Sequence, residues 1–126
     1  MYVIDKLLKK EKPVLTKCEQ MWDYLNCHDA ARALYLLGGH GINREIYNIG
    51  GGAARPLREY VEILRDQIDK GLPLGIGERE YAPEQIMYLC ADISTLARDT
   101  GFYPRISFEN GILETINWCK KCREPL

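Results

Sequence analysis

The stretch YNIGGGAARPLREYVEIL, Tyr47 to Leu64, has the pattern of a strand, a glycine-rich turn and a helix. The dinucleotide-binding fingerprint G-x-G-x-x-G has this layout, and Gly50 and Gly52 occupy its first two glycine positions. The third position holds Arg55, which cannot give the close helix packing that glycine allows. The nearest acidic candidate, Asp69, falls inside the helix instead of after a second strand. We therefore interpret the stretch as a tight turn that needs glycine dihedrals, and expect no cofactor-binding residue in this chain.

Tyr2 and Lys6 fit Y-x-x-x-K, the catalytic pair of short-chain dehydrogenases, in which the lysine lowers the pKa of the tyrosine. The pattern is short and arises often by chance, and the serine that usually precedes the pair would have to lie before Met1. The two serines of the chain, Ser94 and Ser107, both stand where helix caps are expected. We therefore expect no catalytic residue in this chain.

Trp118-Cys119-Lys120-Lys121-Cys122 resembles the W-C-x-x-C motif of redox proteins. In those proteins the first cysteine begins a helix, whose dipole stabilises the thiolate, whereas here the pair is expected to end one. The motif supplies two ligands where a structural zinc needs four, unless the fold brings Cys27, His28 and His40 to it. We expect no metal site, and keep a small redox protein as the least favoured hypothesis.

The composition suits one domain of 126 residues, with 46% apolar residues and a net charge of −1. No basic excess favours nucleic acid, and the one basic cluster, residues 6–12, is interpreted as the solvated side of a short helix. No stretch of about 18 apolar residues predicts a membrane span. Five cysteines without a secretion signal indicate reduced thiols, so we expect a cytoplasmic protein without nucleic-acid or membrane partners.

Local patterns predict alternating helices and strands, and hence an α/β layer structure. The expected strands are residues 21–25, 45–49 and 86–90, with a turn or very short strand at 72–77. The expected helices are residues 2–10, one capped by Asp29 and stopped by Gly38-Gly39, one from Pro56 to Gly71, one capped by Asp92 and closed by Gly101, and one capped by Ser107, with Phe108, Ile112 and Ile116 on its apolar side.

Several segments taken in order resemble a known family. They are LTKCEQMWDYLNCHDAARAL, EIYNIGGG, PLREYVEILRD, LPLGIGE, YAPEQ and ADISTLARDTGFYPRISFENGILETINW. Together they are similar to the C-terminal part of an extended short-chain dehydrogenase/reductase, and more narrowly of an NAD-dependent nucleotide-sugar epimerase/dehydratase.

The resemblance implies a helix-rich α/β fold with a few short strands, forming a single substrate-binding domain over residues 1–126. It also implies that residues 47–49 form a late strand of a Rossmann sheet. The cofactor-binding Rossmann domain, which holds NAD or NADP in the full-length family, would be absent. The chain would then bind a nucleotide-sugar weakly or not at all in isolation, and would be inactive alone.

Two positions depart from the pattern of the family. Many members have arginine where Trp22 stands, before Asp23-Tyr24, and a second arginine where Ala82 stands. These arginines usually grip the diphosphate of the substrate with paired hydrogen bonds. Trp22 could stack on a base or sugar, or could equally belong to the core, while Arg55 or Arg79 could supply the lost charge. With Gln85 of the YAPEQ segment, Trp22, Arg55 and Arg79 form the expected substrate-binding set.

The same resemblance predicts a homo-oligomer. Residues 45–49 would offer the unpaired edge of an incomplete sheet, and an apolar stripe on the next helix would lie in water unless copies cover it. That stripe consists of Leu57, Tyr60, Val61, Leu64 and Ile68. The alternative is a monomer whose own short elements cover the stripe. A non-catalytic binding or assembly module remains the second hypothesis for function.

Overall fold

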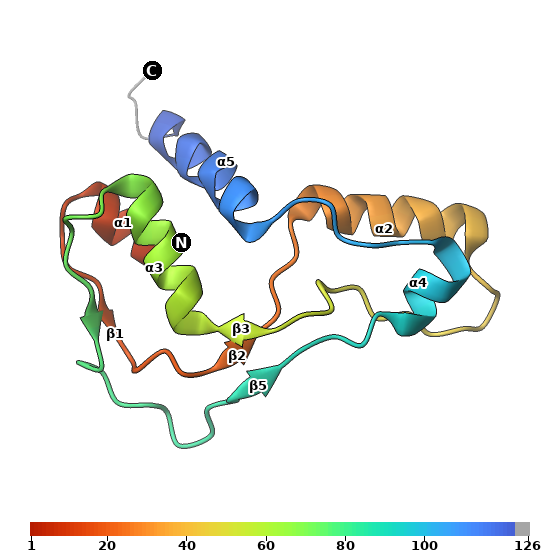
Figure 1. Cartoon of the computed structure of the whole chain (residues 1–126), viewed down its shortest axis with the longest axis horizontal. Coiled ribbons are helices and arrows are strands. Elements are labelled where there is room, and N and C mark those ends of the chain that lie inside the picture. The colour runs from red at the N-terminus through yellow and green to blue at the C-terminus, as the bar shows by residue number, and fades with distance from the viewer. Residues whose placement is uncertain (123–126) are drawn as a thin grey trace.

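The computed structural model describes residues 1–122. Its five helices are α1 (Tyr2–Leu8), α2 (Cys27–His40), α3 (Leu57–Ile68), α4 (Ser94–Thr100) and α5 (Phe108–Lys121). Its five strands have two residues each: β1 (Val14–Leu15), β2 (Met21–Trp22), β3 (Arg55–Pro56), β4 (Gly75–Ile76) and β5 (Tyr88–Leu89). The expected helix-rich α/β fold with a few short strands is confirmed (Figure 1).

The short strands form two small sheets. Strand β1 pairs with β4 in parallel, while β2 lies between an antiparallel β3 and a parallel β5. The first sheet lies beside α1 and α3, and the second lies between the two groups of helices (Figure 1). The sheets therefore serve as links between helices more than as a layer of their own.

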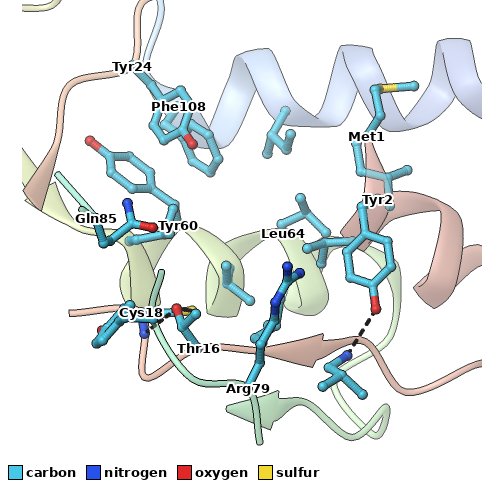
Figure 2. A pocket seen from close by; sticks show the side chains of 18 of the residues that line it. Met1, Tyr2, Thr16, Cys18, Tyr24, Tyr60, Leu64, Arg79, Gln85 and Phe108 are labelled. Carbon is cyan, nitrogen blue, oxygen red and sulfur yellow. Dashed lines mark hydrogen bonds between the residues drawn. The ribbon is translucent and has the colours of Figure 1, made fainter. Parts of the chain in front are cut away.

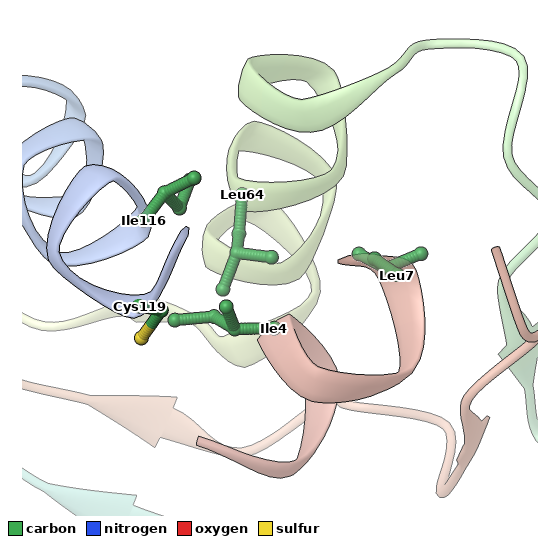
Figure 3. Close-up of a cluster of buried hydrophobic side chains, with 5 residues drawn as sticks. All are labelled: Ile4, Leu7, Leu64, Ile116 and Cys119. Atoms are coloured by element: carbon green, nitrogen blue, oxygen red, sulfur yellow. The ribbon is translucent and has the colours of Figure 1, made fainter. Parts of the chain in front are cut away.

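Helices α1, α3 and α5 pack together around a buried apolar cluster (Figure 3). Ser107 caps α5 as expected, since its hydroxyl accepts a hydrogen bond from the Asn110 amide, and Ile116 of α5 is fully buried. The α3 stripe faces this interior, where Tyr60, Val61 and Leu64 are buried. The expectation that the stripe would lie in water is therefore wrong, because α1 and α5 of the same chain supply its cover. The cluster consists of Ile4, Leu7, Leu64, Ile116 and Cys119.

Helices α2 and α4 form a second group around buried Ala33, Leu96 and Phe102. Gly101 closes α4 in the left-handed conformation, with φ of 68°, as the sequence predicts. The N-cap of α4 is Ile93 and not Asp92 as expected, although the Asp92 carboxylate accepts a hydrogen bond from the Ser94 amide.

Two expectations for α2 are wrong. The N-cap is Asn26, whose side chain accepts from the His28 amide, and Asp29 lies within the first turn of the helix. Asp29 is buried because it binds a more distant part of the chain: its carboxylate accepts from the amides of Arg105 and Ile106. The helix also continues through Gly38-Gly39 to His40, and Leu36 and Leu37, just before the glycines, pack against the α2–α4 cluster.

The expected strand at residues 45–49 is also not formed among the described residues. Tyr47 and Ile49 pack against the α2–α4 cluster, while Ile46 is 84% exposed, so the side chains alternate as in a strand. A strand also requires a hydrogen-bonded neighbour, and no described segment pairs with this one. The local pattern was recognised correctly, but its pairing partner is missing from residues 1–122.

Candidate functional site

The glycine turn at residues 50–52 wraps around a carboxylate of the chain itself. Asp23 accepts hydrogen bonds from the amides of Gly51 (2.8 Å), Gly52 (3.0 Å) and Ala91 (3.1 Å). Glycine is required because a Cβ at Gly51 would lie 2.3 Å from an Asp23 oxygen, and Gly52 has φ of 75°. The amides that could bind a phosphate in such a turn are thus already occupied.

The N-terminus of α3 is likewise engaged. The amide of Leu57 donates to the carbonyl of Gln20 at 2.7 Å, and the amide of Arg58 donates to the carbonyl of Cys18 at 2.8 Å. Free amides at the start of a helix are the usual anion-binding groups of a dinucleotide site. The described residues of this turn and helix therefore do not fit the diphosphate of a nicotinamide cofactor.

A pocket of about 670 Å³ lies between α1, α3, α5 and the segment that follows β4 (Figure 2). Its floor is mostly apolar, with side chains such as Ile4, Val61, Leu64 and Ile112. A volume of this size is typical of sites for small organic molecules. We take this pocket as the candidate site.

One end of the pocket is an aromatic wall formed by Tyr24, Tyr60 and Phe108 (Figure 2). The Tyr24 and Tyr60 rings meet edge to face with centroids 4.9 Å apart, and the Tyr60 and Phe108 centroids are 4.6 Å apart. The Tyr60 hydroxyl donates to the Trp22 carbonyl at 3.1 Å, which fixes that ring. A planar ligand ring could stack or pack edge-on against such a wall.

Burial raises the pKa of both pocket phenols, Tyr24 and Tyr60, and of the buried Cys18 thiol. All three groups therefore stay neutral at pH 7, and none adds a negative charge that would repel an anionic ligand. The raised pKa also makes Cys18 a weak nucleophile, so the site has the character of a binding site.

Two of the four expected substrate-binding residues line this pocket. Arg79 extends from the segment after β4 toward α3, and Gln85 lies near Tyr60 (Figure 2). Within the described part of the chain, the Arg79 guanidinium makes no ion pair or hydrogen bond. Arg79 is thus a free cation at the edge of an apolar, aromatic pocket.

The other two expected residues are not among the residues that line the pocket. Trp22 lies in β2, and its buried indole N–H has no hydrogen-bond partner in residues 1–122. Arg55 lies behind the aromatic wall, where its guanidinium stacks on Tyr60 at 5.3 Å and pairs with Glu109 at 2.9 Å. Arg55 would have to leave Glu109 to reach a ligand, whereas Arg79 would not.

The aromatic wall was not predicted from the sequence. Tyr60 and Phe108 were assigned only to apolar helix stripes, and Tyr24 only to a strand. Nothing in their spacing shows that three separate segments bring these rings together. The one available signal was the density of aromatic residues from Trp22 to Tyr24.

Residues of the other sequence motifs make structural contacts within the fold. Lys6 pairs with Glu11 at 2.5 Å, and the Tyr2 hydroxyl accepts from the Val14 amide at 3.2 Å. Cys119 is buried in the α1–α3–α5 cluster, while Cys122 is exposed. No group of three or more potential metal ligands occurs among residues 1–122, and no helix there is long and apolar enough to span a membrane.

No family model matches the chain. Individual curated proteins do: the chain is 31% identical to dTDP-glucose 4,6-dehydratase of Shigella flexneri, over 94% of this chain and 34% of that protein. The dTDP-glucose 4,6-dehydratase of Neisseria gonorrhoeae is 29% identical over 94% of this chain and 37% of its own length. The chain thus spans about a third of the length of the curated relatives it matches.

Solved structures give the same result for the fold. The UDP-N-acetylglucosamine 4-epimerase of Methanobrevibacter ruminantium, in complex with UDP-N-acetylmuramic acid, matches with a TM-score of 0.85 and 25% identity. That match covers 96% of this chain and 38% of the epimerase. The Bacillus anthracis dTDP-glucose 4,6-dehydratase, in complex with NAD, gives a TM-score of 0.82 and 22% identity over 97% and 39% of the two chains.

Proposed function

We propose that this chain, which belongs to the NAD-dependent nucleotide-sugar epimerase/dehydratase family and corresponds to its C-terminal part, binds a nucleotide-sugar. The binding site is the pocket between α1, α3 and α5. Hydride transfer, which such enzymes perform with NAD or NADP, is left to residues outside this chain. The chain alone is inactive.

The observation that carries this proposal is the pairing of a free cation with an aromatic wall. A nucleotide-sugar combines a planar base, an anionic diphosphate and a polar sugar. The rings of Tyr24, Tyr60 and Phe108 suit the base, and Arg79 suits the diphosphate because its guanidinium can give two parallel hydrogen bonds to one anion. Gln85 can donate to and accept from hydroxyl groups.

Arg79 also compensates for the two missing family arginines. Trp22 and Ala82 stand at those positions, and neither side chain can bind a diphosphate. Because Arg79 is the only arginine among the described residues that line the pocket, we expect weaker binding than a site with two arginines provides. Arg55 is a reserve cation that becomes available only if its bond to Glu109 opens.

Isothermal titration calorimetry with dTDP-glucose and UDP-glucose tests the proposal. We expect weak binding that Arg79→Ala removes, while Arg98→Ala on α4 retains it, because Arg98 lies outside the pocket and pairs with Asp99. A chain that binds neither sugar nucleotide at millimolar concentration would contradict the proposal. Equal binding by wild type and Arg79→Ala would also contradict it.

A turnover assay tests the second half of the proposal. With NAD or NADP added, the isolated chain should convert neither sugar nucleotide. Turnover that disappears in Tyr2→Phe or Lys6→Met would show that this chain carries its own catalytic pair.

The non-catalytic assembly module remains the second candidate function. The exposed apolar residues of the α2 region favour it, since a pure ligand-binding domain does not need them. The small redox protein has less support, because Cys119 is buried among apolar side chains.

A further inference from the structure

The last turn of α5 carries two cysteines that the proposed function does not use. Cys119 is 4% exposed and packs in the α1–α3–α5 cluster beside Ile4 (Figure 3). Cys122 is exposed and is the C-cap of α5. The pair therefore has one thiol in the apolar interior and one at the surface, only three residues apart in sequence.

The backbone holds the two cysteines within reach of a disulfide. The Cys122 amide donates to the Trp118 carbonyl at 3.0 Å, and Cys122 has helical dihedrals, with φ of −68° and ψ of −9°. Residues three apart in a helix have Cα atoms about 5 Å apart, inside the range of roughly 4.4–6.8 Å found in disulfides. Their Cβ atoms, about 5–6 Å apart, must close by about 1–2 Å. Such a shift is small at the end of a helix, where Cys122 lies.

We propose that Cys119 and Cys122 form a reversible redox-modification site, at which hydrogen peroxide converts the two thiols into an intramolecular disulfide that loosens the α1–α3–α5 cluster. The disulfide modifies this chain and is not a redox activity toward another protein. Cys122 reacts first because it is the exposed member of the pair.

The reaction has two steps. The Cys122 thiolate attacks one oxygen of hydrogen peroxide and the O–O bond breaks, so that Cys122 becomes a sulfenic acid and the other oxygen leaves as water with the thiol proton. The Cys119 sulfur then attacks the Cys122 sulfur, the S–O bond breaks, and the hydroxyl group leaves as water with the Cys119 proton. Two electrons pass from the sulfurs to peroxide. Dithiothreitol reverses the change by thiol–disulfide exchange at the exposed Cys122 sulfur.

The disulfide requires the Cys119 side chain to move. A disulfide holds its sulfurs about 2.05 Å apart, so one cannot stay in the interior while the other stays at the surface. Moving the Cys122 sulfur inward would overfill a packed cluster and would draw the exposed, charged Lys121 toward it. The Cys119 sulfur therefore turns outward and leaves its place beside Ile4.

The cluster shares residues with the candidate site. Ile4 and Leu64 belong to the α1–α3–α5 cluster and also line the pocket. When Cys119 turns outward, these two side chains lose a packing neighbour and hold the pocket floor less firmly. We therefore expect weaker ligand binding in the oxidised chain. This last expectation rests on the proposed function, whereas the disulfide and the loosened cluster do not.

Mass spectrometry under non-reducing conditions tests the modification. Hydrogen peroxide should lower the mass of the folded wild-type chain by about 2 Da, and dithiothreitol should restore it. Trypsin cleaves after Lys120 and Lys121, which separates the two cysteines, so the non-reduced digest should contain two peptides joined by the Cys119–Cys122 bond.

Two variants control this experiment. Cys122→Ser should not show the loss of mass, whereas Cys27→Ser, which removes the exposed cysteine at the start of α2, should show it as wild type does. A wild-type chain that gives only sulfinic acid, only disulfides between chains, or a disulfide to Cys27 would overturn the proposal.

Hydrogen exchange tests the loosened cluster without any ligand. The amides of α1 should exchange faster in the oxidised chain than in the reduced chain. Exchange in α2 and α4 should stay the same, because these helices pack around the other cluster. Peroxide-treated Cys122→Ser should exchange like the reduced wild type. Equal exchange of α1 in both redox forms would overturn the proposal, since Cys119 would then have kept its place.

Calorimetry with UDP-glucose tests the effect on the pocket. After removal of peroxide, the oxidised wild type should bind several-fold more weakly than the reduced chain. Cys122→Ser should bind equally before and after treatment, which also controls for oxidation of Met1 in the pocket wall. Equal affinity of the two wild-type forms would overturn the link between disulfide and pocket. If neither form binds, the proposed function fails, while mass and hydrogen exchange still decide the disulfide.

Discussion

The α1–α3–α5 group and the α2–α4 group cover their apolar helix faces to different extents. In the first group, the α3 stripe meets α1 on one side and α5 on the other. In the second, α2 meets α4 with one face while Leu34 and Tyr35 on the other face stay exposed. The difference shows that the apolar faces of a helix indicate how much cover it needs, but not which segment provides the cover.

Truncating one buried residue in the first group should have the largest effect. Ile116→Ala opens a cavity between α5, α1 and α3, so we expect a loss of about 2–5 kcal/mol in the free energy of unfolding. Leu34→Ala removes an exposed side chain and should change stability by less than about 0.5 kcal/mol in dilute monomer. Urea denaturation followed by circular dichroism measures both. Equal losses would mean that the Leu34 side of α2 is covered within the chain.

The stability of the second group depends more on polar contacts, and a substitution of Asp29 tests this. Its buried carboxylate holds residues 105–106 and Arg32. Asp29→Ala leaves these donors unpaired, so we expect a loss of about 3 kcal/mol. Denaturation of the variant at neutral pH checks the magnitude. A change below about 0.5 kcal/mol would show that surrounding water replaces the carboxylate.

The same carboxylate should make stability depend on pH. Burial raises the pKa of Asp29, but the amides of Ile106 and Arg105 and the Arg32 guanidinium outweigh burial and leave the pKa below its ordinary value. The contribution of Asp29 is thus present above the pKa of an unfolded aspartate and is lost as pH falls through the lower folded pKa. In denaturation experiments between pH 6 and pH 2, the free energy of unfolding should fall less steeply with decreasing pH in Asp29→Ala than in wild type.

Sequence patterns predicted the fold well wherever the partner of an element lies in the same segment or a neighbouring one. The Ser107 cap, the Gly101 closure and the α5 apolar face are set by local chemistry, and all are confirmed. Residues 45–49 have strand-like alternation, but strand formation depends on a neighbour that residues 1–122 do not contain. The role of Asp29 was misassigned because its partners lie 76 and 77 residues away.

The candidate site was predictable only in part, for the same reason. Arg79 was expected as a replacement for a lost family arginine and Gln85 came from the YAPEQ segment of the family resemblance, and both line the pocket. The Arg55–Glu109 bond and the meeting of Tyr24 with Tyr60 and Phe108 join segments far apart in sequence. Such contacts follow from tertiary packing, which spacing along the chain does not encode.

Two glycines of the chain also differ in how much space surrounds their backbone. Gly51 is enclosed, because a Cβ there would lie 2.3 Å from an Asp23 oxygen and 3.0 Å from the Tyr24 carbonyl, whereas Gly38 of α2 has open space. Gly51→Ala should therefore destabilise the chain by about 1–3 kcal/mol. Gly38→Ala should stabilise dilute monomer by about 0.5–1 kcal/mol, since alanine favours a helix. Opposite signs in thermal denaturation are the expected outcome, and matching signs would contradict it.

A small effect is expected at Glu109, whose bond to Arg55 joins the start of α5 to β3, immediately before α3. Both side chains are 40% exposed, so Glu109→Gln should lower stability by less than about 1 kcal/mol, and less again at high salt. The hydrogen bond from Arg55 holds the pKa of Glu109 below its ordinary value, so this small contribution exists above the pKa of an unfolded glutamate and disappears as pH falls through the folded pKa.

Glu109→Gln should also change stability and ligand binding in opposite directions. Without its carboxylate partner, the Arg55 guanidinium, which stacks on Tyr60, is free to turn from Glu109 toward the pocket. If Arg55 is the reserve cation of the site, the variant should bind a sugar diphosphate more tightly than wild type in calorimetry, although it is slightly less stable. Asp66→Asn, which removes the carboxylate paired with Arg65 of α3 outside the pocket, serves as the matched control and should leave binding unchanged. Tighter binding in both variants would mean only that the net charge has become less negative, and unchanged binding in both would restrict the anion to Arg79.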